Sequence, residues 1–338
     1  MDSDSRYSRQ RVLPEIGDDG QRRLSESRAV VVGCGALGTV HASLLVRAGV
    51  GETVLIDRDY VEPDNLHRQL LFDERDSELG TPKAVAAAAS LRRANSSVKV
   101  TAHVADLDAM NVERLLRDAT VILDGTDNFE TRFLINDVAV KRSIPWIYGA
   151  AVGTRGSVMP VLPGRTACLA CIFPAAPQSR QPTCDTAGVL NAATSAIASL
   201  QVAEALKVLT GRPDAVKARM VSLDLWQGEK SSVRADRPAP DCRTCGQRDF
   251  RFLDSGVPSA VRICGRDAVQ VAARGRPVDL ASLAMILSSL GPVQWTEHAL
   301  RFWCPPHELT VFPDGRAIVK GTQDTGLARS LCARFLGL

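Results

Sequence analysis

The feature that most constrains this chain is a glycine-rich turn between a strand and a helix. Gly33-Cys34-Gly35-Ala36-Leu37-Gly38 has the spacing G-x-G-x-x-G. It follows the apolar run 29–32 and precedes a helical stretch over 38–48, which is the context in which this motif binds a nucleotide. The glycines permit a tight turn and let phosphate reach the backbone N–H groups at the helix start. The motif predicts a nucleotide site without separating ATP from NAD, and a glycine turn with no ligand is the alternative.

The first 150 residues alternate short β-branched runs with helical stretches. We expect strands at 29–32, 54–57, 98–104 and 120–124, and helices at 38–48, from Thr81 onward and at 129–141. The second of these helices should have Thr81 as N-cap and Pro82 at its first position. This alternation predicts parallel strands joined by right-handed crossovers. The expected fold class is therefore α/β, with a doubly wound, mostly parallel, Rossmann-like sheet.

The rest of the chain changes character twice. Residues 160–186 are rich in Pro, Gly, Cys and Thr and are expected to form a long loop, which is usually functional or disordered. A small-residue helix over 191–209 and a charged stretch at 231–240 follow. After Gly246 we expect strands at 260–272, 299–303, 309–312 and 316–319, and helices at 280–290 and 327–336. These elements predict one domain over 1–246 and a small α+β domain over 247–338.

Composition excludes several classes of protein. The chain is 45% hydrophobic and 23% charged, which excludes disorder, collagen-like repeats and a coiled coil. Its net charge of +3 is too balanced for non-specific nucleic-acid binding. The N-terminus has no apolar secretory segment, and the uncharged stretches 29–46 and 186–203 contain glycines or polar residues that make poor membrane spans. We expect a cytoplasmic protein that binds neither nucleic acid nor membrane.

The cysteines predict a metal site. Nine cysteines without an export signal favour metal ligands and free thiols over disulfides. Cys168-x-x-Cys171 and Cys242-x-x-Cys245 form two pairs whose separation is far longer than in a compact zinc ribbon. If the fold brings them together, four thiolates make a closed structural Zn²⁺ site. A redox role for the pairs is the alternative.

The other cysteines divide into two groups. Cys184 stands in the loop before the small-residue helix, where a nearby helix N-terminus would lower its thiol pKa and supply a nucleophile. The remaining four lie in apolar runs and are expected to be small buried hydrophobes; they are Cys34, Cys264, Cys304 and Cys332.

Polar residues follow the strands that flank the glycine turn. Asp57 and Asp59 end the second strand, where an acid meets ribose hydroxyls. Arg68 and Lys83 come next, and a cation at a helix start opposes the macrodipole, so Lys83 suggests a bound anion. These cations suit a triphosphate, although a solvated surface is the alternative. Asp127 follows the strand 120–124 and could hold Mg²⁺, but it is also a natural N-cap.

Together these motifs resemble the ThiF/MoeB adenylyltransferases, the bacterial relatives of ubiquitin-activating enzymes. The resemblance covers about residues 5 to 246. Its elements, in chain order, are Arg6-Tyr7-Ser8-Arg9-Gln10, Gly20-Gln21, the 33–38 loop, Asp57-Arg58-Asp59, Asn65 to Gln69, Pro82-Lys83, Thr126-Asp127-Asn128, both cysteine pairs and Thr183-Cys184-Asp185. Because the motifs are independent of one another, the resemblance is specific, and it makes 1–246 an adenylation domain.

The resemblance implies an activity and a set of roles. Family members bind Mg·ATP and the Gly-Gly tail of a small ubiquitin-like sulfur carrier, whose carboxylate attacks the α-phosphate. Matching positions imply nucleotide-binding roles for Gly33, Gly35, Gly38, Asp57, Asp59, Asn65, Gln69 and Asn128, phosphate-positioning roles for Arg68 and Lys83, and a Mg²⁺-ligand role for Asp127. Asp59 would hold the ribose. Arg9 would reach into the partner subunit's site, which implies a homodimer.

Sulfur transfer and the C-terminal domain are less specified. Cys184 matches a position that attaches covalently to the carrier in ThiF-like members, whereas MoeB-like members adenylate without that step. Longer members often carry a rhodanese domain, but Cys264-Gly265-Arg266 is too short for its loop, so a cysteine desulfurase or another donor would supply sulfur. We expect residues 247–338 to form a docking or dimer-supporting module. The pathway stays open between thiamine, molybdenum cofactor and other thio-products.

Two other functions remain as alternatives. An NAD-dependent oxidoreductase fits the glycine loop and Asp57 but leaves Arg68, Lys83 and the cysteine pairs unexplained. A catalytically silent relative that serves as a binding scaffold would retain the fold but not require Arg68, Lys83 and Asp127 together. Reduced-cofactor absorbance would favour the first, and nucleotide binding without turnover the second.

Overall fold

The computed structural model describes residues 3–175, 184–254, 260–262, 267–271 and 277–336. The chain forms two compact units, Met1–Leu79 with Lys83–Ser255, and Gly80–Pro82 with Gly256–Leu338. The first unit runs past Gly246, because the short helix α12 (Arg251–Asp254) packs on α8 (Phe129–Arg142). Phe252 stacks on Phe133 of α8 with ring centroids 4.9 Å apart.

The first unit is built on one eight-stranded sheet. Its strands are β1 (Arg28–Val32), β2 (Glu52–Asp57), β3 (Lys99–Val104), β4 (Val121–Asp124), β5 (Trp146–Val152), β6 (Arg155–Val161), β7 (Arg219–Asp224) and β8 (Glu229–Arg234), in the order β3-β2-β1-β4-β5-β6-β7-β8. The first five strands of that order pair in parallel and the last three are antiparallel. The α/β prediction of a mostly parallel sheet is confirmed. The strand order reverses between β1 and β4, which is where such sheets bind ligands.

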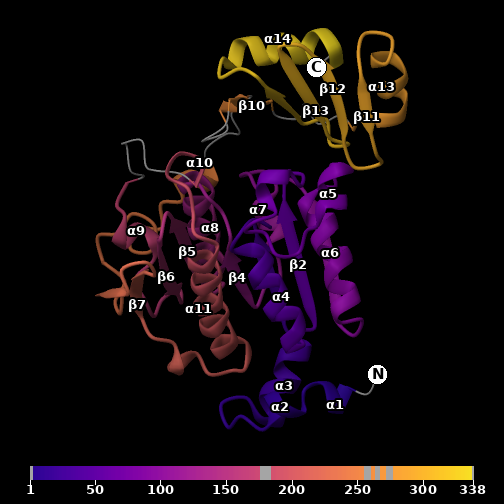
Figure 1. Ribbon diagram of the computed structural model, residues 1–338. Helices are drawn as coiled ribbons and strands as arrows, with labels where there is room; N and C mark the ends of the chain where they lie inside the picture. The colour runs from indigo at the N-terminus through magenta and orange to yellow at the C-terminus, as the bar shows by residue number, and fades with distance from the viewer. Residues whose placement is uncertain (1–2, 176–183, 255–259, 263–266, 272–276, 337–338) are drawn as a thin grey trace. The chain divides into compact units, whose positions relative to one another are not determined.

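Helices cover both faces of this sheet. One face packs on α3 (Gly17–Glu26), α4 (Gly38–Ala48), α6 (Lys83–Ala94) and α11 (Asn191–Leu209), and the other on α7 (Val112–Leu115), α8 and α9 (Leu169–Ile172). Along β1, Val31 belongs to the first apolar cluster and Val30 to the second, because successive strand residues point to opposite faces. Helices α4 and α11 lie side by side (Figure 1).

Several elements differ from the sequence-based expectation. The region 160–186 begins inside β6 and contains α9 and the one-turn helix α10 (Cys184–Ala187), so it is not one continuous loop. Helix α6 begins at Lys83, so Pro82 precedes the helix instead of occupying its first position. The charged stretch at 231–240 begins within β8, every residue of which is exposed. An edge strand that buries neither face has no apolar alternation to reveal it.

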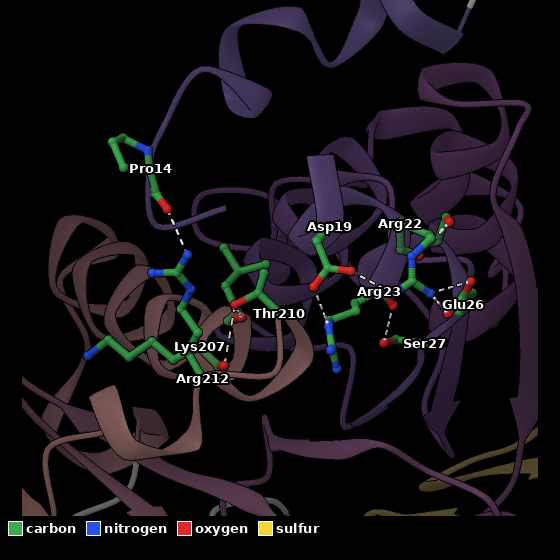
Figure 2. Close-up of polar contacts among 11 residues, drawn as sticks. Pro14, Asp19, Arg22, Arg23, Glu26, Ser27, Lys207, Thr210 and Arg212 are labelled. Carbon is green, nitrogen blue, oxygen red and sulfur yellow. Dashed lines mark hydrogen bonds and ion pairs between the residues drawn. The ribbon is translucent and has the colours of Figure 1, made fainter. Parts of the chain in front are cut away.

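Short helices complete the first unit. They are α1 (Ser3–Arg6), α2 (Ser8–Arg11), α5 (Glu74–Glu78) and the 3-10 helices η1 (Pro63–Asn65) and η2 (Pro213–Ala215). Figure 2 shows how the N-terminal segment is fastened to the end of α11: Arg212 Nη2 donates to Pro14 O at 2.7 Å. On α3, Asp19 pairs with both Arg22 and Arg23 in exposed contacts that contribute little each.

A buried polar network joins α4, α11 and the sheet. His41 Nε2 lies 2.8 Å from Gln201 Oε1, and Gln201 Nε2 donates to Asp124 O and Ile147 O, each at 2.9 Å. Both side chains are fully buried. Helix α11 is long and apolar enough to cross a membrane by length and composition. Within the unit, however, it packs on β4, β5, β6 and α4 and carries Gln201 into the core, as a core helix does.

We expect His41 to make the protein acid-sensitive. Burial lowers the pKa of His41 from 6.5 to about 4. As the pH falls, the imidazole is therefore protonated near pH 6.5 in the unfolded chain but only near pH 4 in the folded chain. The contribution of His41 to stability is fully present above pH 6.5 and is lost as the pH falls toward 4. Between pH 7 and 5 the loss is about 2 kcal/mol for this one group. Urea unfolding of wild type and His41→Asn at both pH values measures it, and an equal pH dependence in the two proteins would contradict the assignment.

The second unit is an antiparallel sheet with two helices. Its strands are β9 (Ala260–Arg262), β10 (Ala268–Val271), β11 (Val293–Trp295), β12 (Leu300–Cys304), β13 (His307–Val311) and β14 (Ala317–Lys320), in the order β11-β12-β13-β14-β10-β9. Helices α13 (Leu280–Leu287) and α14 (Thr325–Leu336) share its apolar core. The turn at 313–315 joins β13 and β14 as a hairpin. The single strand expected over 260–272 is instead two strands.

Candidate functional site

The glycine turn lies where β1 ends, beside the turn that follows β4. Gly33 has φ +87°, and a Cβ on it would lie 2.6 Å from Gly125 O. A Cβ on Gly38 would lie only 1.7 Å from Gly33 O. These two positions exclude any side chain because backbone atoms already fill the space. The turn is therefore closed tightly against the start of α4 and against the end of β4.

Gly35 differs from its two neighbours. A Cβ built on Gly35 meets no atom of the chain within 4 Å. The chain itself does not need glycine there for space, whereas a phosphate group approaching the backbone at a helix start does. Open space at the middle glycine of the motif, with steric closure at the other two, fits a nucleotide-binding loop.

Asp57, the last residue of β2, forms a hydrogen bond to the backbone of the glycine loop. Its Oδ2 accepts from Cys34 N at 2.5 Å and its Oδ1 accepts from Asp59 N at 2.7 Å. Burial raises the pKa of Asp57, and the positive charge of Lys83 partly offsets this effect. The carboxylate therefore ties the tip of β1 to the segment after β2.

Lys83 lies in the protein interior. Its side chain is 5% exposed, its Nζ lies 3.3 Å from Asp59 Oδ2, and its backbone N donates to Asp59 O at 2.9 Å. The alternative of a solvated surface lysine is wrong, because α6 begins at this residue with its side chain turned inward. A buried ammonium beside a carboxylate is positioned to exchange that partner for a ligand's phosphate.

Arg58 forms an ion pair with Asp106 that sequence reasoning missed. Arg58 Nη1 donates to Asp106 Oδ1 at 3.1 Å, and Arg58 Nε lies 3.9 Å from Asp59 Oδ1. Burial opposes the charge of Arg58, yet the surrounding carboxylates, Asp106 first and Asp127 among them, raise its pKa. The signal in the sequence was the arginine between two aspartates. Asp106 follows a different strand, so only the fold shows the pairing.

The end of η1 and the segment that follows it carry one cation and two amides, namely Arg68, Asn65 and Gln69. Asn65 is fully buried; its Oδ1 accepts from Glu62 N at 3.2 Å and its Nδ2 donates to Asp64 Oδ1 at 2.8 Å. Arg68 is partly exposed and its Nη1 donates to Asp64 O at 2.5 Å. Gln69 is buried, and its Oε1 has no hydrogen-bond partner among the described residues.

The turn after β4 settles which residue caps α8. Asn128 is the N-cap, because its side chain accepts from Thr131 N at 2.8 Å. Asp127 is exposed, and its Oδ1 takes a long hydrogen bond of 3.4 Å from Asn128 Nδ2. The alternative in which Asp127 caps the helix is therefore wrong. Its carboxylate stays at the carboxyl end of a parallel strand, where Mg²⁺ ligands are often found.

Beneath this turn lies a buried ion pair that the sequence did not reveal. Asp124 and Arg132 approach to 3.3 Å and are 0% and 7% exposed. Arg132 Nη2 also donates to Thr126 O at 2.6 Å and to Gly149 O at 3.2 Å. Burial raises the pKa of Asp124, and the guanidinium of Arg132 counters that shift. The pair holds the turn that carries Asp127 against β5.

The two cysteine pairs come together on the face of the sheet covered by α8. The four sulfur atoms lie within 4.8 Å of one another. The Sγ–Sγ distance is 3.8 Å between Cys168 and Cys171, 3.7 Å between Cys168 and Cys242, and 3.4 Å between Cys171 and Cys245. Four sulfurs bound at about 2.3 Å in a tetrahedron would be about 3.8 Å apart. The convergence expected from the sequence is confirmed, and the cluster fits Zn²⁺.

The remaining predicted residues lie apart from these groups or outside the part of the chain that the structure describes. Arg9 is exposed on α2. Cys184 begins the one-turn helix α10, seven residues before the long helix α11 starts at Asn191; its side chain lies outside the described residues. Cys34 and Cys332 are buried as expected, whereas Cys304 is partly exposed. Cys264 lies outside the described residues.

The chain is similar to known adenylyltransferases. The ThiF family profile matches residues 7–244. Over 336 residues the chain is 44% identical to the sulfur carrier protein ThiS adenylyltransferase of Bacillus subtilis, covering 98% of this chain and 99% of that protein. Over 249 residues it is 38% identical to the sulfur carrier protein adenylyltransferase of Thermus thermophilus, covering 71% and 90%. The Bacillus relative therefore matches the second unit as well as the first.

Solved structures show the same fold. The crystal structure of E. coli MccB with ATP superposes with a TM-score of 0.62 at 24% identity, covering 71% of this chain and 74% of that chain. At this identity the similarity concerns the fold alone. The profile match and the full-length similarity to the Bacillus protein together establish the relationship: this chain belongs to the ThiF family.

Proposed function

We propose that this chain adenylates the C-terminal glycine of a ubiquitin-like sulfur carrier protein with ATP. The proposal rests on three groups that follow the carboxyl ends of the parallel strands. They are the glycine loop with open space at Gly35, the buried ammonium of Lys83, and the carboxylate of Asp127, which does not cap α8. A dinucleotide oxidoreductase needs the loop but neither of the other two groups. The similarity to sulfur carrier adenylyltransferases over nearly the whole chain supports the same activity.

The proposed role of each residue follows from the charge of the ligand group that it would contact. In the proposed complex the backbone at Gly35 faces phosphate, Asp59 holds the ribose, and Lys83 leaves Asp59 to bind phosphate oxygens together with Arg68. Asn65 and Gln69 are proposed to position the same phosphates, because the NH₂ group of a side-chain amide donates to phosphate oxygens. Asp127, beside Asn128, is the proposed Mg²⁺ ligand.

The reaction joins two anions, so neutralisation of charge is the central requirement. A carboxylate oxygen of the carrier forms a bond to the α-phosphorus while the bond to the β-phosphate oxygen breaks, giving an acyl-adenylate and pyrophosphate. Magnesium on the phosphates would draw charge from the leaving group. Lys83 and Arg68 supply two further positive charges to the pentavalent transition state and the leaving pyrophosphate. They also reduce the repulsion that the incoming carboxylate meets in the ground state.

Other parts of the proposal concern assembly and sulfur. The four cysteines are proposed to hold a structural Zn²⁺, a group that cross-links the 168–171 and 242–245 segments and takes no part in the reaction. Arg9, exposed on α2, is proposed to enter the site of a second copy in a homodimer. The second unit is proposed as a docking or dimer-supporting module. A cysteine desulfurase or a comparable donor would then deliver sulfur to the activated carrier.

Pyrophosphate exchange tests the proposed function directly. The purified chain is incubated with ATP, Mg²⁺ and labelled pyrophosphate, together with each small Gly-Gly-ended protein of the same genome. We expect label to enter ATP with one such carrier, and to require its free terminal carboxylate, so that the same carrier with its C-terminus amidated is inactive. If folded, zinc-loaded protein exchanges no label with any carrier, the proposed function is wrong.

Replacement of Cys184 should separate adenylation from sulfur transfer. Cys184→Ala is expected to keep carrier-dependent exchange within about threefold of wild type, because none of the groups proposed to bind the phosphates belongs to α10. It should abolish any covalent adduct between the chain and the carrier, since a thiol is the only nucleophile proposed for that bond. Mass spectrometry of the reaction mixture detects the adduct. Collapse of exchange in folded Cys184→Ala would show that the two steps are not divided in this way.

A further inference from the structure

Two adjacent residues of helix α8 contact the two chain segments that carry the cysteine pairs. Asn136 and Asp137 are each 0% exposed and lie on the side of α8 that meets the cluster. Polar side chains in the middle of a buried helix carry a desolvation cost, and they are retained where their hydrogen bonds are needed. The question is what these two side chains hold.

Asn136 holds the first cysteine pair. Its Oδ1 accepts from Leu169 N at 2.8 Å, and its Nδ2 lies 3.7 Å from Cys168 Sγ as a donor to that sulfur. Leu169 directly follows Cys168 and begins α9, which carries Cys171. One amide therefore fixes the backbone beside Cys168 and at the same time offers its N–H to the sulfur. A donor to sulfur favours the thiolate that a metal requires.

Asp137 holds the second pair. Its Oδ1 accepts from Thr244 Oγ1 at 3.2 Å, and its Oδ2 accepts from Phe252 N at 2.9 Å. Thr244 is itself fully buried and stands between Cys242 and Cys245. The carboxylate thus fixes the turn that carries both sulfurs and also the helix α12 that closes behind it. Neither partner of Asp137 belongs to the first cysteine pair.

Hydrogen bonds and an ion pair also hold the N-terminal turns of α8 in place. Asn128 caps the helix, and Arg132 is bound to Asp124, Thr126 O and Gly149 O. The helix is therefore a fixed element against which two segments far apart in the chain are aligned. Without such a frame, the metal itself would have to supply the whole ordering free energy of bringing the two pairs together.

We propose that Asn136 and Asp137 are positioning residues of the metal centre, each presetting one cysteine pair on α8 so that four sulfurs face one Zn²⁺. This inference rests on the zinc site of the proposed function but not on the adenylation reaction. Residues that orient metal ligands from behind typically contribute 10- to 100-fold to metal affinity. Their roles are distinguishable, because Asn136 donates to a sulfur and Asp137 touches none.

Metal competition measures the contribution of each residue, and Asp137→Ala should weaken Zn²⁺ binding without shifting the Co²⁺ band, because Asp137 touches no sulfur. The full-length chain is stripped, reloaded with Zn²⁺ and titrated with a chelator, and Co²⁺ is loaded in parallel to record its thiolate charge-transfer band. We expect Asn136→Ala to weaken Zn²⁺ binding about 10- to 100-fold. Asn136→Asp keeps the acceptor for Leu169 N but removes the donor to Cys168 and adds a negative charge, so it should bind more weakly than Asn136→Ala and shift the Co²⁺ band.

Two reference variants give the range of Zn²⁺ affinity within which the effect of a positioning residue is judged. Cys242→Ser removes a proposed ligand and should lose the metal, which sets the lower limit of affinity. Val140→Ala shortens a buried apolar side chain of α8 that offers neither cysteine pair a hydrogen bond, so it should lower the unfolding temperature with Zn²⁺ affinity within about twofold of wild type. Equal Zn²⁺ loss in Val140→Ala and Asn136→Ala would overturn the proposal, as would wild-type affinity in both Asn136 variants. Because metal affinity is read without ATP, failure here leaves pyrophosphate exchange as an independent test of adenylation.

Discussion

Replacing Asp127 with Asn is expected to reduce carrier-dependent pyrophosphate exchange about 10²- to 10³-fold and to leave the unfolding temperature unchanged. The first expectation follows from the loss of one negative ligand for Mg²⁺ at the point where charge develops on the leaving pyrophosphate. The second follows from its position: the side chain is exposed, and α8 is capped by Asn128. Exchange rates at saturating and limiting Mg²⁺ measure the effect, and high Mg²⁺ should restore part of the rate.

The neighbouring residue provides the matched control. Asn128→Ala removes the side chain that accepts from Thr131 N and should cost about 1 kcal/mol of stability. Its exchange rate should fall far less than that of Asp127→Asn. If the two variants show the opposite order, with Asp127→Asn less stable and still active, then Asp127 serves the helix and the metal lies elsewhere.

The sequence predicted those parts of the fold that local chemistry controls. Helix α4 runs over 38–48 as expected, because glycines stand at both ends and Gly49, at φ +83°, ends it in a left-handed conformation. Helix α11 also has its expected bounds. The strand–turn–helix context was sufficient to place the glycine turn between β1 and α4. In each case the signal lies within a few residues of the feature it predicts.

Features that depend on the partner of a residue were missed. Asp124 was interpreted only as the end of a strand, although it forms the buried pair with Arg132 that supports the turn carrying Asp127. Arg58 stood inside a recognised motif, but its partner Asp106 follows β3. Gln201 joins α11 to β4 and β5 through backbone carbonyls, which no pattern of side chains encodes. Such pairings arise from strand order, which sequence periodicity does not give.

The cysteine pairs lie between these two cases. Their spacing predicted a metal site on chemical grounds, and their distance apart in the chain meant that only the fold could join them. The sulfur-to-sulfur distances of 3.4–3.8 Å confirm the junction. Their support from Asn136 and Asp137 could not be anticipated, because a polar residue within an apolar helix gives no indication of what it contacts. The four cysteines of the proposed metal site were predictable from sequence, whereas the two residues proposed to orient them were not.

The glycines of the loop should respond to alanine in opposite ways. Gly38→Ala places a Cβ 1.7 Å from Gly33 O, a backbone atom that cannot move aside, so we expect a loss of more than about 3 kcal/mol in unfolding free energy or failure to fold. Gly35→Ala meets no atom of the chain within 4 Å, so its unfolding free energy should change by less than about 1 kcal/mol. Its methyl group would instead occupy the space through which phosphate reaches the backbone.

ATP binding distinguishes a nucleotide loop from a purely structural turn. Calorimetric titration of Gly35→Ala with Mg·ATP should show affinity at least about tenfold weaker than wild type, with the bound zinc and the unfolding temperature retained, because a displaced phosphate loses hydrogen bonds from the helix start. A turn that only connects β1 to α4 would tolerate alanine at Gly35 in both measurements. Wild-type ATP affinity in this variant would therefore mean that the triphosphate does not lie on the loop, and Lys83 and Asp127 would lose their proposed common ligand.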